Sequence, residues 1–173
     1  MSKRITRITG RGMVTLRGDL SDPTLTAAVT AATGCAVPSL RQIVWNGDQA
    51  VAWMSPDELL LIVTDAPTTV TQLSQALTGI HHLAADVSDA RATFRITGPW
   101  RDILAGGAPV DLHPDAFQPG EIRRTRLGQV AAAFWATNPD TAELVCFASV
   151  AEFVGIWLET AATEGAEPNL YAG

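Results

Sequence analysis

Three arginine side chains crowd one short segment of the sequence and are its clearest candidates for binding chemistry. Arg123, Arg124 and Arg126 lie between Ile122 and Leu127. Guanidinium forks suit carboxylate and phosphate groups, on a small anion or on a partner protein. On a strand, Arg124 and Arg126 would share one face and Arg123 would take the other. We favour contact with a partner; a solvated strand face or intersubunit ion pairs are the alternatives.

A second candidate is the carboxylate of Asp111, which has Asp115 nearby in the same Pro-punctuated segment. An aspartate in a loop usually forms a turn, because its side chain hydrogen-bonds the backbone two residues further on. A ligand-binding carboxylate is the alternative, and Asp111 is its only candidate here.

Tryptophans supply the remaining candidates for contact with another chain. Of the five, Trp45, Trp53 and Trp135 are expected in the core. Trp100 follows Pro99 in the first turn of a helix, and we expect it to be more exposed. Trp157 lies in a C-terminal helix whose apolar arc is wider than one core-facing stripe needs. Aromatic and arginine side chains are enriched at interfaces, so the candidate subunit contacts are Trp100, Arg123, Arg124, Arg126 and Trp157.

The sequence offers no catalytic residue set and no metal site. His81 and His82 are neighbours, and neighbouring side chains on a strand point to opposite faces. His113 is a loop residue. The sequence has no Cys-x-x-Cys, no His-x-x-x-His, no Gly-Lys-Ser phosphate loop and no Gly-x-Ser-x-Gly elbow, and its only lysine is Lys3. The glycines at 10 and 12 precede a strand instead of following one, which does not fit a dinucleotide fingerprint.

Composition narrows the class of protein. The chain has 173 residues, 47% hydrophobic and 17% charged, with a net charge of −6. An acidic balance disfavours a general nucleic-acid binder. No apolar run approaches the roughly 20 residues of a membrane helix, and no signal peptide is recognisable. Cys146 lies in an apolar segment and is expected to be a buried thiol, although a disulfide with Cys35 stays open. We expect a cytoplasmic protein that binds neither nucleic acid nor membrane.

The elements that must position these residues occur in two similar series. The second series begins with a strand at 91–97, whose apolar residues alternate, and a helix that starts at Pro99. A hairpin at 122–135, a strand at 143–147 and a helix at 149–158 follow. Ser149 and Glu152 predict a capping box at the start of that helix.

The first series has the same order. A strand at 13–18 leads into a helix that starts at Asp22-Pro23, and a hairpin at 41–53 turns at Asn46-Gly47. A strand at 59–63 and a helix at 67–77 complete it, and a further strand at 80–87 crosses between the two series.

Together these patterns predict an α+β fold with two pseudo-symmetric β-α-β-β-β-α halves, mainly antiparallel sheets and packed helices. We expect a flexible arm at 1–12, a single domain at 13–160 made of the repeats 13–79 and 91–160, and a tail at 161–173. Lys3, Arg4, Arg7 and Arg11 make the arm basic.

A run of short motifs between residues 86 and 127 indicates a protein family. They are Asp86-Val87-Ser88, Arg95-Ile96-Thr97-Gly98-Pro99, Arg101-Asp102-Ile103-Leu104-Ala105, Pro109-Val110-Asp111-Leu112-His113, Phe117-x-Pro119-Gly120 and Arg124-Thr125-x-Leu127. This segment resembles the gamma subunit of bacterial heterotetrameric sarcosine oxidase. The resemblance extends back through Trp53-Met54-Ser55-Pro56-Asp57-Glu58 and forward to Phe153, so it covers nearly the whole chain.

The resemblance implies a structural subunit of an oxidoreductase complex, without catalysis by the chain itself. Such a complex oxidatively demethylates sarcosine to glycine and yields hydrogen peroxide and formaldehyde or methylene-tetrahydrofolate. The implied partners are the alpha, beta and delta subunits. Flavins, NAD and tetrahydrofolate are expected on those subunits, with zinc on the smallest, and no cofactor is expected on this chain.

A more distant resemblance links the architecture to the folate-binding domain of the glycine-cleavage aminomethyltransferase. In that family an Asn-Asp pair follows the strand-helix unit and the aspartate works at the folate site. Asp111 falls on the aspartate, whereas Val110 replaces the asparagine. The alternative function is therefore a stand-alone folate-binding or one-carbon transfer module. An assembly factor of the same fold class, acting on iron–sulfur proteins, is a third hypothesis.

Overall fold

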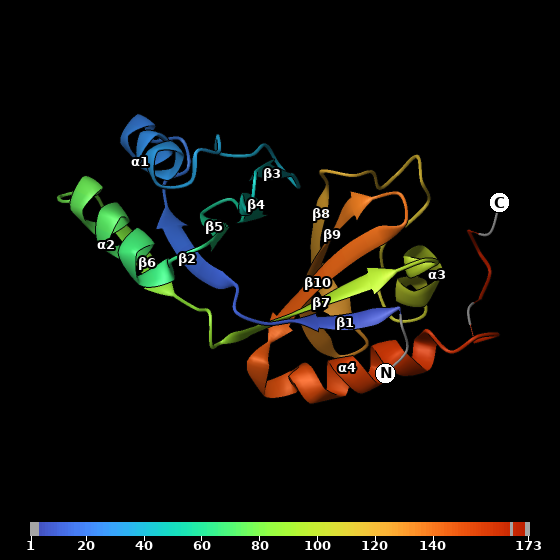
Figure 1. Cartoon of the computed structure of the whole chain (residues 1–173). Helices are drawn as coiled ribbons and strands as arrows, with labels where there is room; N and C mark the ends of the chain where they lie inside the picture. Colours follow the sequence, from blue (N-terminus) through green and yellow to red (C-terminus); the bar gives the residue numbers. More distant parts are fainter. Residues whose placement is uncertain (1–3, 167, 172–173) are drawn as a thin grey trace. The chain divides into compact units, whose positions relative to one another are not determined.

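The computed structural model describes residues 4–166 and 168–171, which form two five-stranded sheets and four α-helices (Figure 1). In chain order the elements are β1 (Ile5–Ile8), β2 (Gly12–Gly18), α1 (Pro23–Thr33), β3 (Ile43–Asn46), β4 (Gln49–Ser55), β5 (Glu58–Val63), α2 (Ala66–Ala76), β6 (His82–Asp86), β7 (Arg91–Thr97), α3 (Trp100–Ala105), β8 (Ile122–Leu127), β9 (Val130–Asn138), β10 (Thr141–Phe147), the 3₁₀ turn η1 (Ala148–Val150) and α4 (Ala151–Ala161).

The chain divides into two compact units. The inserted unit is Gly10–Asp89, and the discontinuous unit combines Met1–Thr9 with Ala90–Gly173. The chain passes from one unit to the other twice. The first crossing falls after β1, which therefore belongs with the C-terminal half of the chain.

The inserted unit contains one antiparallel sheet with the strand order β3-β4-β5-β2-β6. Helices α1 and α2 pack on one face of this sheet, where apolar residues from the strands and both helices form its core. The core includes Leu16 on β2, Leu25 on α1, Leu61 on β5 and Leu73 on α2. The alternation predicted for the first strand thus delivers its apolar side chains to the helices.

The discontinuous unit repeats this plan with the order β8-β9-β10-β7-β1. Each strand holds the same sheet position as its counterpart in the inserted unit, so the β-α-β-β-β-α repeat and the α+β class are confirmed. The fifth place is filled by β6 in one sheet and by β1 in the other. The strand β1 lies within residues 1–12, where a flexible arm was expected. Its residue Ile5 pairs with Ile96 and turns its side chain into the core, so this part of the arm is a strand of the sheet.

Local signals explain most of these boundaries. Asp22 caps α1 by accepting a hydrogen bond from the Thr24 backbone N–H at 2.7 Å, and Gly34 ends the helix in the left-handed conformation at φ 70°. Gly47 and Asp48 form the two-residue connection between β3 and β4, with Gly47 at φ 59°, and Asn46 pairs with Gln49 as the last residue of β3. The turn therefore lies one residue after the predicted Asn46-Gly47.

Helix α4 begins differently from the expected capping box. Its N-cap is Val150, no side chain caps it, and Ser149 lies in the 3₁₀ turn η1 instead. The prediction failed because the short turn after β10 moves the start of the helix past the position where Ser149 and Glu152 could cap each other.

Candidate functional site

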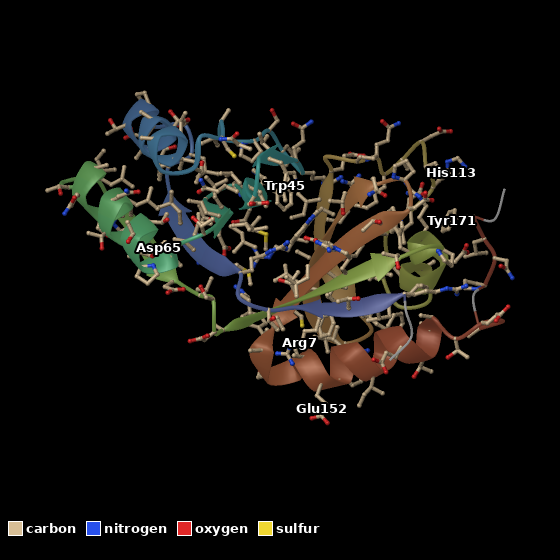
Figure 2. The ribbon with its side chains drawn as sticks, in the orientation of Figure 1. Arg7, Trp45, Asp65, His113, Glu152 and Tyr171 are labelled. Carbon is tan, nitrogen blue, oxygen red and sulfur yellow. The ribbon has the colours of Figure 1, made fainter. Side chains whose placement is uncertain are left out.

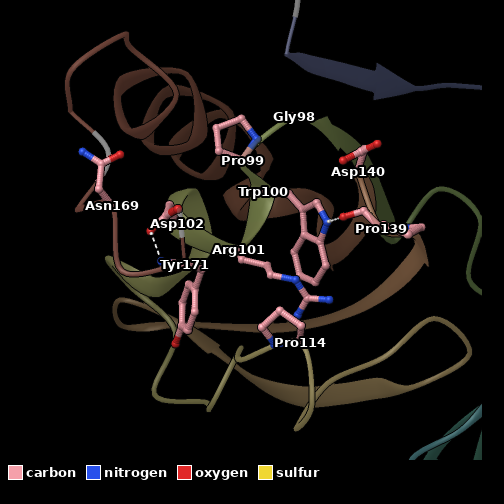
Figure 3. Close-up of a pocket in the computed structure, with 10 residues that line it drawn as sticks. All are labelled: Gly98, Pro99, Trp100, Arg101, Asp102, Pro114, Pro139, Asp140, Asn169 and Tyr171. Carbon is pink, nitrogen blue, oxygen red and sulfur yellow. Dashed lines mark hydrogen bonds between the residues drawn. The ribbon is translucent and has the colours of Figure 1, made fainter. Parts of the chain in front are cut away.

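A pocket of about 470 Å³ lies beside α3 in the discontinuous unit (Figure 3). It is lined by Gly98, Pro99, Trp100, Arg101, Asp102, Pro114, Pro139, Asp140, Asn169 and Tyr171. The lining therefore combines the start of α3, the loop around 114, the β9–β10 turn and the C-terminal segment.

The start of α3 is fixed by hydrogen bonds to the turn between β9 and β10. Gly98 adopts φ 83° directly after β7, and its N–H donates to the Asp140 carbonyl at 2.9 Å. Trp100 is fully buried and its Nε1–H donates to the Pro139 carbonyl at 2.9 Å. Its ring also meets the edge of Phe117, with 5.7 Å between ring centroids. The expectation that Trp100 is exposed is wrong, because its polar atom finds a partner inside the core.

Arg101 is a half-buried cation at the side of the pocket. Its Nη1 donates to the Leu112 carbonyl at 2.6 Å, and its guanidinium lies 4.3 Å from the centre of the Trp100 ring. Burial lowers the pKa of Arg101 from its ordinary value, while the nearby Tyr171 side chain acts in the opposite direction. These contacts hold the guanidinium against the protein and tie α3 to the loop that follows it.

Asp102 is the least expected residue of this site, since its side chain is only 4% exposed. Its Oδ1 accepts hydrogen bonds from the backbone N–H groups of Leu170 at 2.6 Å and of Tyr171 at 3.3 Å. A buried carboxylate needs such donors to offset its desolvation. The C-terminal segment thus supplies part of the pocket wall and is bound to the carboxylate at the same time.

The lining of the pocket includes the charged groups of Arg101 and Asp140 and the side chain of Tyr171, whereas the Asp102 carboxylate is already engaged by the C-terminal segment. Tyr171 also meets His113 edge to face, with 6.4 Å between the ring centroids, and Figure 2 shows these two side chains close together. The arrangement offers recognition groups and an aromatic wall, which are the features of a binding site.

Asp111, the folate-site candidate, lies outside this pocket. It is exposed, and its Oδ1 accepts a hydrogen bond from the His113 backbone N–H at 2.9 Å. That contact, two residues along the chain, is the turn-forming role expected above, to which ligand binding was the alternative.

The three arginines lie on β8, an edge strand, and alternate between its faces as predicted. Arg123 is largely buried: it donates to the Ala116 carbonyl at 3.0 Å, pairs with Glu121 at 3.2 Å and lies 4.8 Å from the centre of the Phe117 ring. Arg124 and Arg126 are exposed on the other face. Arg126 borders a shallow depression of about 290 Å³ beside Gly106 and Gly107. Of the three arginines, only Arg124 and Arg126 are therefore exposed and accessible to a partner.

Trp157 is half-buried and packs over the glycines that end α3. A Cβ built on Gly107 would lie 2.6 Å from Cζ2 of the Trp157 ring, so this close approach requires glycine. The exposed apolar residues of α4 are instead Phe153 and Ile156, which were not among the candidate contact residues. The wide apolar arc of the helix was the signal that could have identified them.

Within residues 4–166 and 168–171, no group of three or more His, Cys, Asp or Glu side chains could hold a metal ion. Cys35 and Cys146 are both free and buried, and burial raises the pKa of Cys146 to about 11. No helix formed by these residues has the length and apolar character required to cross a bilayer.

Comparison with known proteins identifies relatives over most of the chain. The profile of the sarcosine oxidase, gamma subunit family matches residues 17–164. The sarcosine oxidase subunit gamma of Arthrobacter sp. is 30% identical over 147 residues, covering 83% of this chain and 72% of the relative. The protein of the same name from Corynebacterium sp. (strain U-96) is 32% identical over 142 residues, covering 80% and 69%.

Solved structures agree with these relatives. A chain of the heterotetrameric sarcosine oxidase from Corynebacterium sp. U-96, solved with pyrrole 2-carboxylate, matches with a TM-score of 0.85 at 27% identity, over 94% of this chain and 84% of that one. The glycine cleavage system aminomethyltransferase T from Bartonella henselae shares the fold, with a TM-score of 0.64 at 13% identity, over 89% and 44%. The family profile spans most of the sequence, and the chain therefore belongs to the sarcosine oxidase gamma subunit family.

Proposed function

We propose that this chain is a structural subunit of a heterotetrameric sarcosine oxidase and that the reacting groups lie on its partners. The observation that carries the proposal is the match to a chain of the solved heterotetrameric enzyme over 94% of this sequence. In the proposed complex, sarcosine is oxidatively demethylated to glycine, with hydrogen peroxide and formaldehyde or methylene-tetrahydrofolate as products. The alpha, beta and delta subunits are the partners, and they hold the flavins, NAD and tetrahydrofolate.

The contacts of the candidate residues are consistent with a structural role. Trp100 and Arg123 serve the packing of the discontinuous unit, and Asp111 forms a turn. The Asp102 carboxylate is engaged by the C-terminal segment of the same chain. Each of these groups already has a partner that explains its position.

The test is affinity purification of the tagged chain from its native cells, followed by flavin absorbance and a peroxide assay with sarcosine. We expect a yellow complex with larger partners and sarcosine-dependent peroxide. Within that complex, Asp111→Ala should leave kcat unchanged, because the residue has no part in the reaction. A colourless chain that elutes alone would contradict the subunit role, and a large loss of kcat in Asp111→Ala would contradict the non-catalytic one.

One observation favours the alternative, a folate-binding or one-carbon transfer module. The pocket beside α3 has an aromatic wall at Tyr171 and an amide at Asn169, which suit a flat heterocycle. The expected carboxylate, Asp111, is not among the lining residues. Calorimetry with tetrahydrofolate tests this alternative: binding that is lost in Tyr171→Ala but kept in Asp111→Ala would place folate in this pocket, and no heat of binding would reject it.

A further inference from the structure

Helix α4 exposes two large apolar side chains on one side. Phe153 is 51% exposed and Ile156 is 61% exposed, and residues three apart on a helix lie next to each other. The opposite side of the helix, with Ala151, Val154 and Leu158, is buried in the core of the discontinuous unit. The core therefore leaves Phe153 and Ile156, two large apolar side chains of this helix, largely uncovered.

Two carboxylates flank these apolar side chains. Glu152 comes one turn before Ile156 and Glu159 nearly one turn after it, and no Lys, Arg or His occurs in α4. Figure 2 shows Glu152 directed away from the sheet on which the helix packs. We name the set of Glu152, Phe153, Ile156 and Glu159 the α4 outer face.

The α4 outer face sits on a fixed support. The aromatic ring of Phe94 lies against Gly155, where an added Cβ would come within 3.4 Å of it. Beyond the helix, Nη1 of Arg4 donates to the Ala162 carbonyl at 3.3 Å and ties the start of the chain to the end of α4. A surface held in this way loses little conformational entropy when it binds a partner.

We infer that the α4 outer face docks into an apolar groove with a basic rim on one of the larger subunits of the complex. The inference rests on the proposed function and adds the surface and the chemistry of its partner. Phe153 and Ile156 would fill the groove as one apolar side of a helix does. Lys or Arg side chains at the rim would pair with Glu152 and Glu159.

A second copy of this chain is a poorer occupant. Pairing α4 with itself would bring four carboxylates into one contact, and the helix has no basic residue to balance them. Like charges brought together at an interface disfavour association. The net charge of −6 for the whole chain also favours a basic partner surface.

The test compares variants of the chain co-expressed with the partner subunits recovered by affinity purification. We expect Phe153→Ser/Ile156→Ser to lower retention of the partners at least tenfold, with an unchanged melting temperature because both side chains are exposed. The matched controls are Leu40→Ser and Leu83→Ser, which alter exposed leucines of the inserted unit, 66% and 54% exposed, and should assemble normally. Glu152→Lys/Glu159→Lys should also weaken assembly and reduce its sensitivity to salt.

Each outcome separates this inference from the proposed function. Failure of the unaltered chain to assemble with the subunits would reject the proposed function itself. Normal assembly of Phe153→Ser/Ile156→Ser would reject the α4 outer face while leaving the subunit role intact. A dimer of the isolated chain that becomes monomeric in this variant would identify a second copy as the occupant and overturn the basic groove.

Discussion

Asp102 and Leu170 are 68 residues apart in the sequence, yet the N–H of Leu170 donates to Oδ1 of Asp102 at 2.6 Å. The acceptor lies in the short helix α3 and the donor in the C-terminal segment. Because the carboxylate is almost fully buried, this contact fixes the end of the chain to the pocket beside α3.

Removing this carboxylate should release the C-terminal segment. We expect Asp102→Ala to cost about 1–3 kcal/mol of unfolding free energy, the usual range for a lost hydrogen bond to a charged group. Hydrogen exchange at the amides of Leu170 and Tyr171 should become faster. Asp111→Ala is the control, because its carboxylate also accepts a backbone N–H but only within a local turn. Equal exchange rates in Asp102→Ala and the unaltered chain would show that the segment is held by other contacts.

The two glycines that end α3 should respond differently to an added methyl group. At Gly107 a Cβ would lie 2.6 Å from Trp157 and 3.1 Å from Leu127, whereas at Gly106 the nearest atom is 3.8 Å away. We expect Gly107→Ala to lower the free energy of unfolding by about 1–3 kcal/mol through overpacking. Gly106→Ala should stay within about 0.5 kcal/mol of the unaltered chain. Urea denaturation checks both, and equal midpoints would mean that Trp157 moves aside without cost.

Cys146 should react very slowly with thiol reagents in the folded chain. Burial raises the pKa of its thiol to about 11, so only about one molecule in a thousand carries the thiolate at pH 8. A Cys35→Ser variant isolates this thiol. Labelling with a disulfide reagent should be slow in buffer and rapid in denaturant, and rapid labelling in buffer would contradict the burial of Cys146.

The first turn of α2 should lose stability in acid. The Asp65 carboxylate accepts hydrogen bonds from the backbone N–H of Thr68 at 3.1 Å and from its hydroxyl at 2.8 Å, which lowers the pKa of Asp65. A lowered pKa stabilises the folded state above the unfolded value of about 4, and the contribution disappears as the pH falls through the folded value.

Thermal melts of Asp65→Asn should therefore fall below those of the unaltered chain at pH 7 and converge with them near pH 2. Asp89→Asn, which removes a charge from an exposed turn residue, is the control. A constant difference between Asp65→Asn and the unaltered chain at all pH values would show that the charge of Asp65 is not the cause.

Much of this fold is predictable from the sequence because its signals are local. Asp22-Pro23 starts a helix through interactions within a few residues, and Gly47 allows the hairpin predicted there, although its turn is Gly47-Asp48 instead of Asn46-Gly47. The strand β1 was missed because it is four residues long and its partner β7 lies far along the chain. A segment of only four residues gives no local sign that it will be paired.

The site was less predictable for a related reason. Burial of Trp100 depends on the Pro139 carbonyl, and the role of Asp102 depends on the C-terminal segment, so both rest on contacts between distant segments. The role of Asp111 was predictable, because its turn needs only the backbone N–H of His113, two residues further along the chain. Periodicity identifies which face of an element is apolar, but it does not reveal which distant backbone group satisfies a buried polar atom.

The pairing of β1 with β7 also sets an order of events during synthesis. Ile8 lies opposite Thr93, so the ribosome must make roughly 85 further residues before β1 has a neighbour, which takes roughly 4–17 s at typical rates of translation. The inserted unit is complete within that interval and can fold first. The strand β1 is therefore made before the inserted unit but reaches its final place after it, and until then it is an unprotected strand that factors bound to the nascent chain could shield.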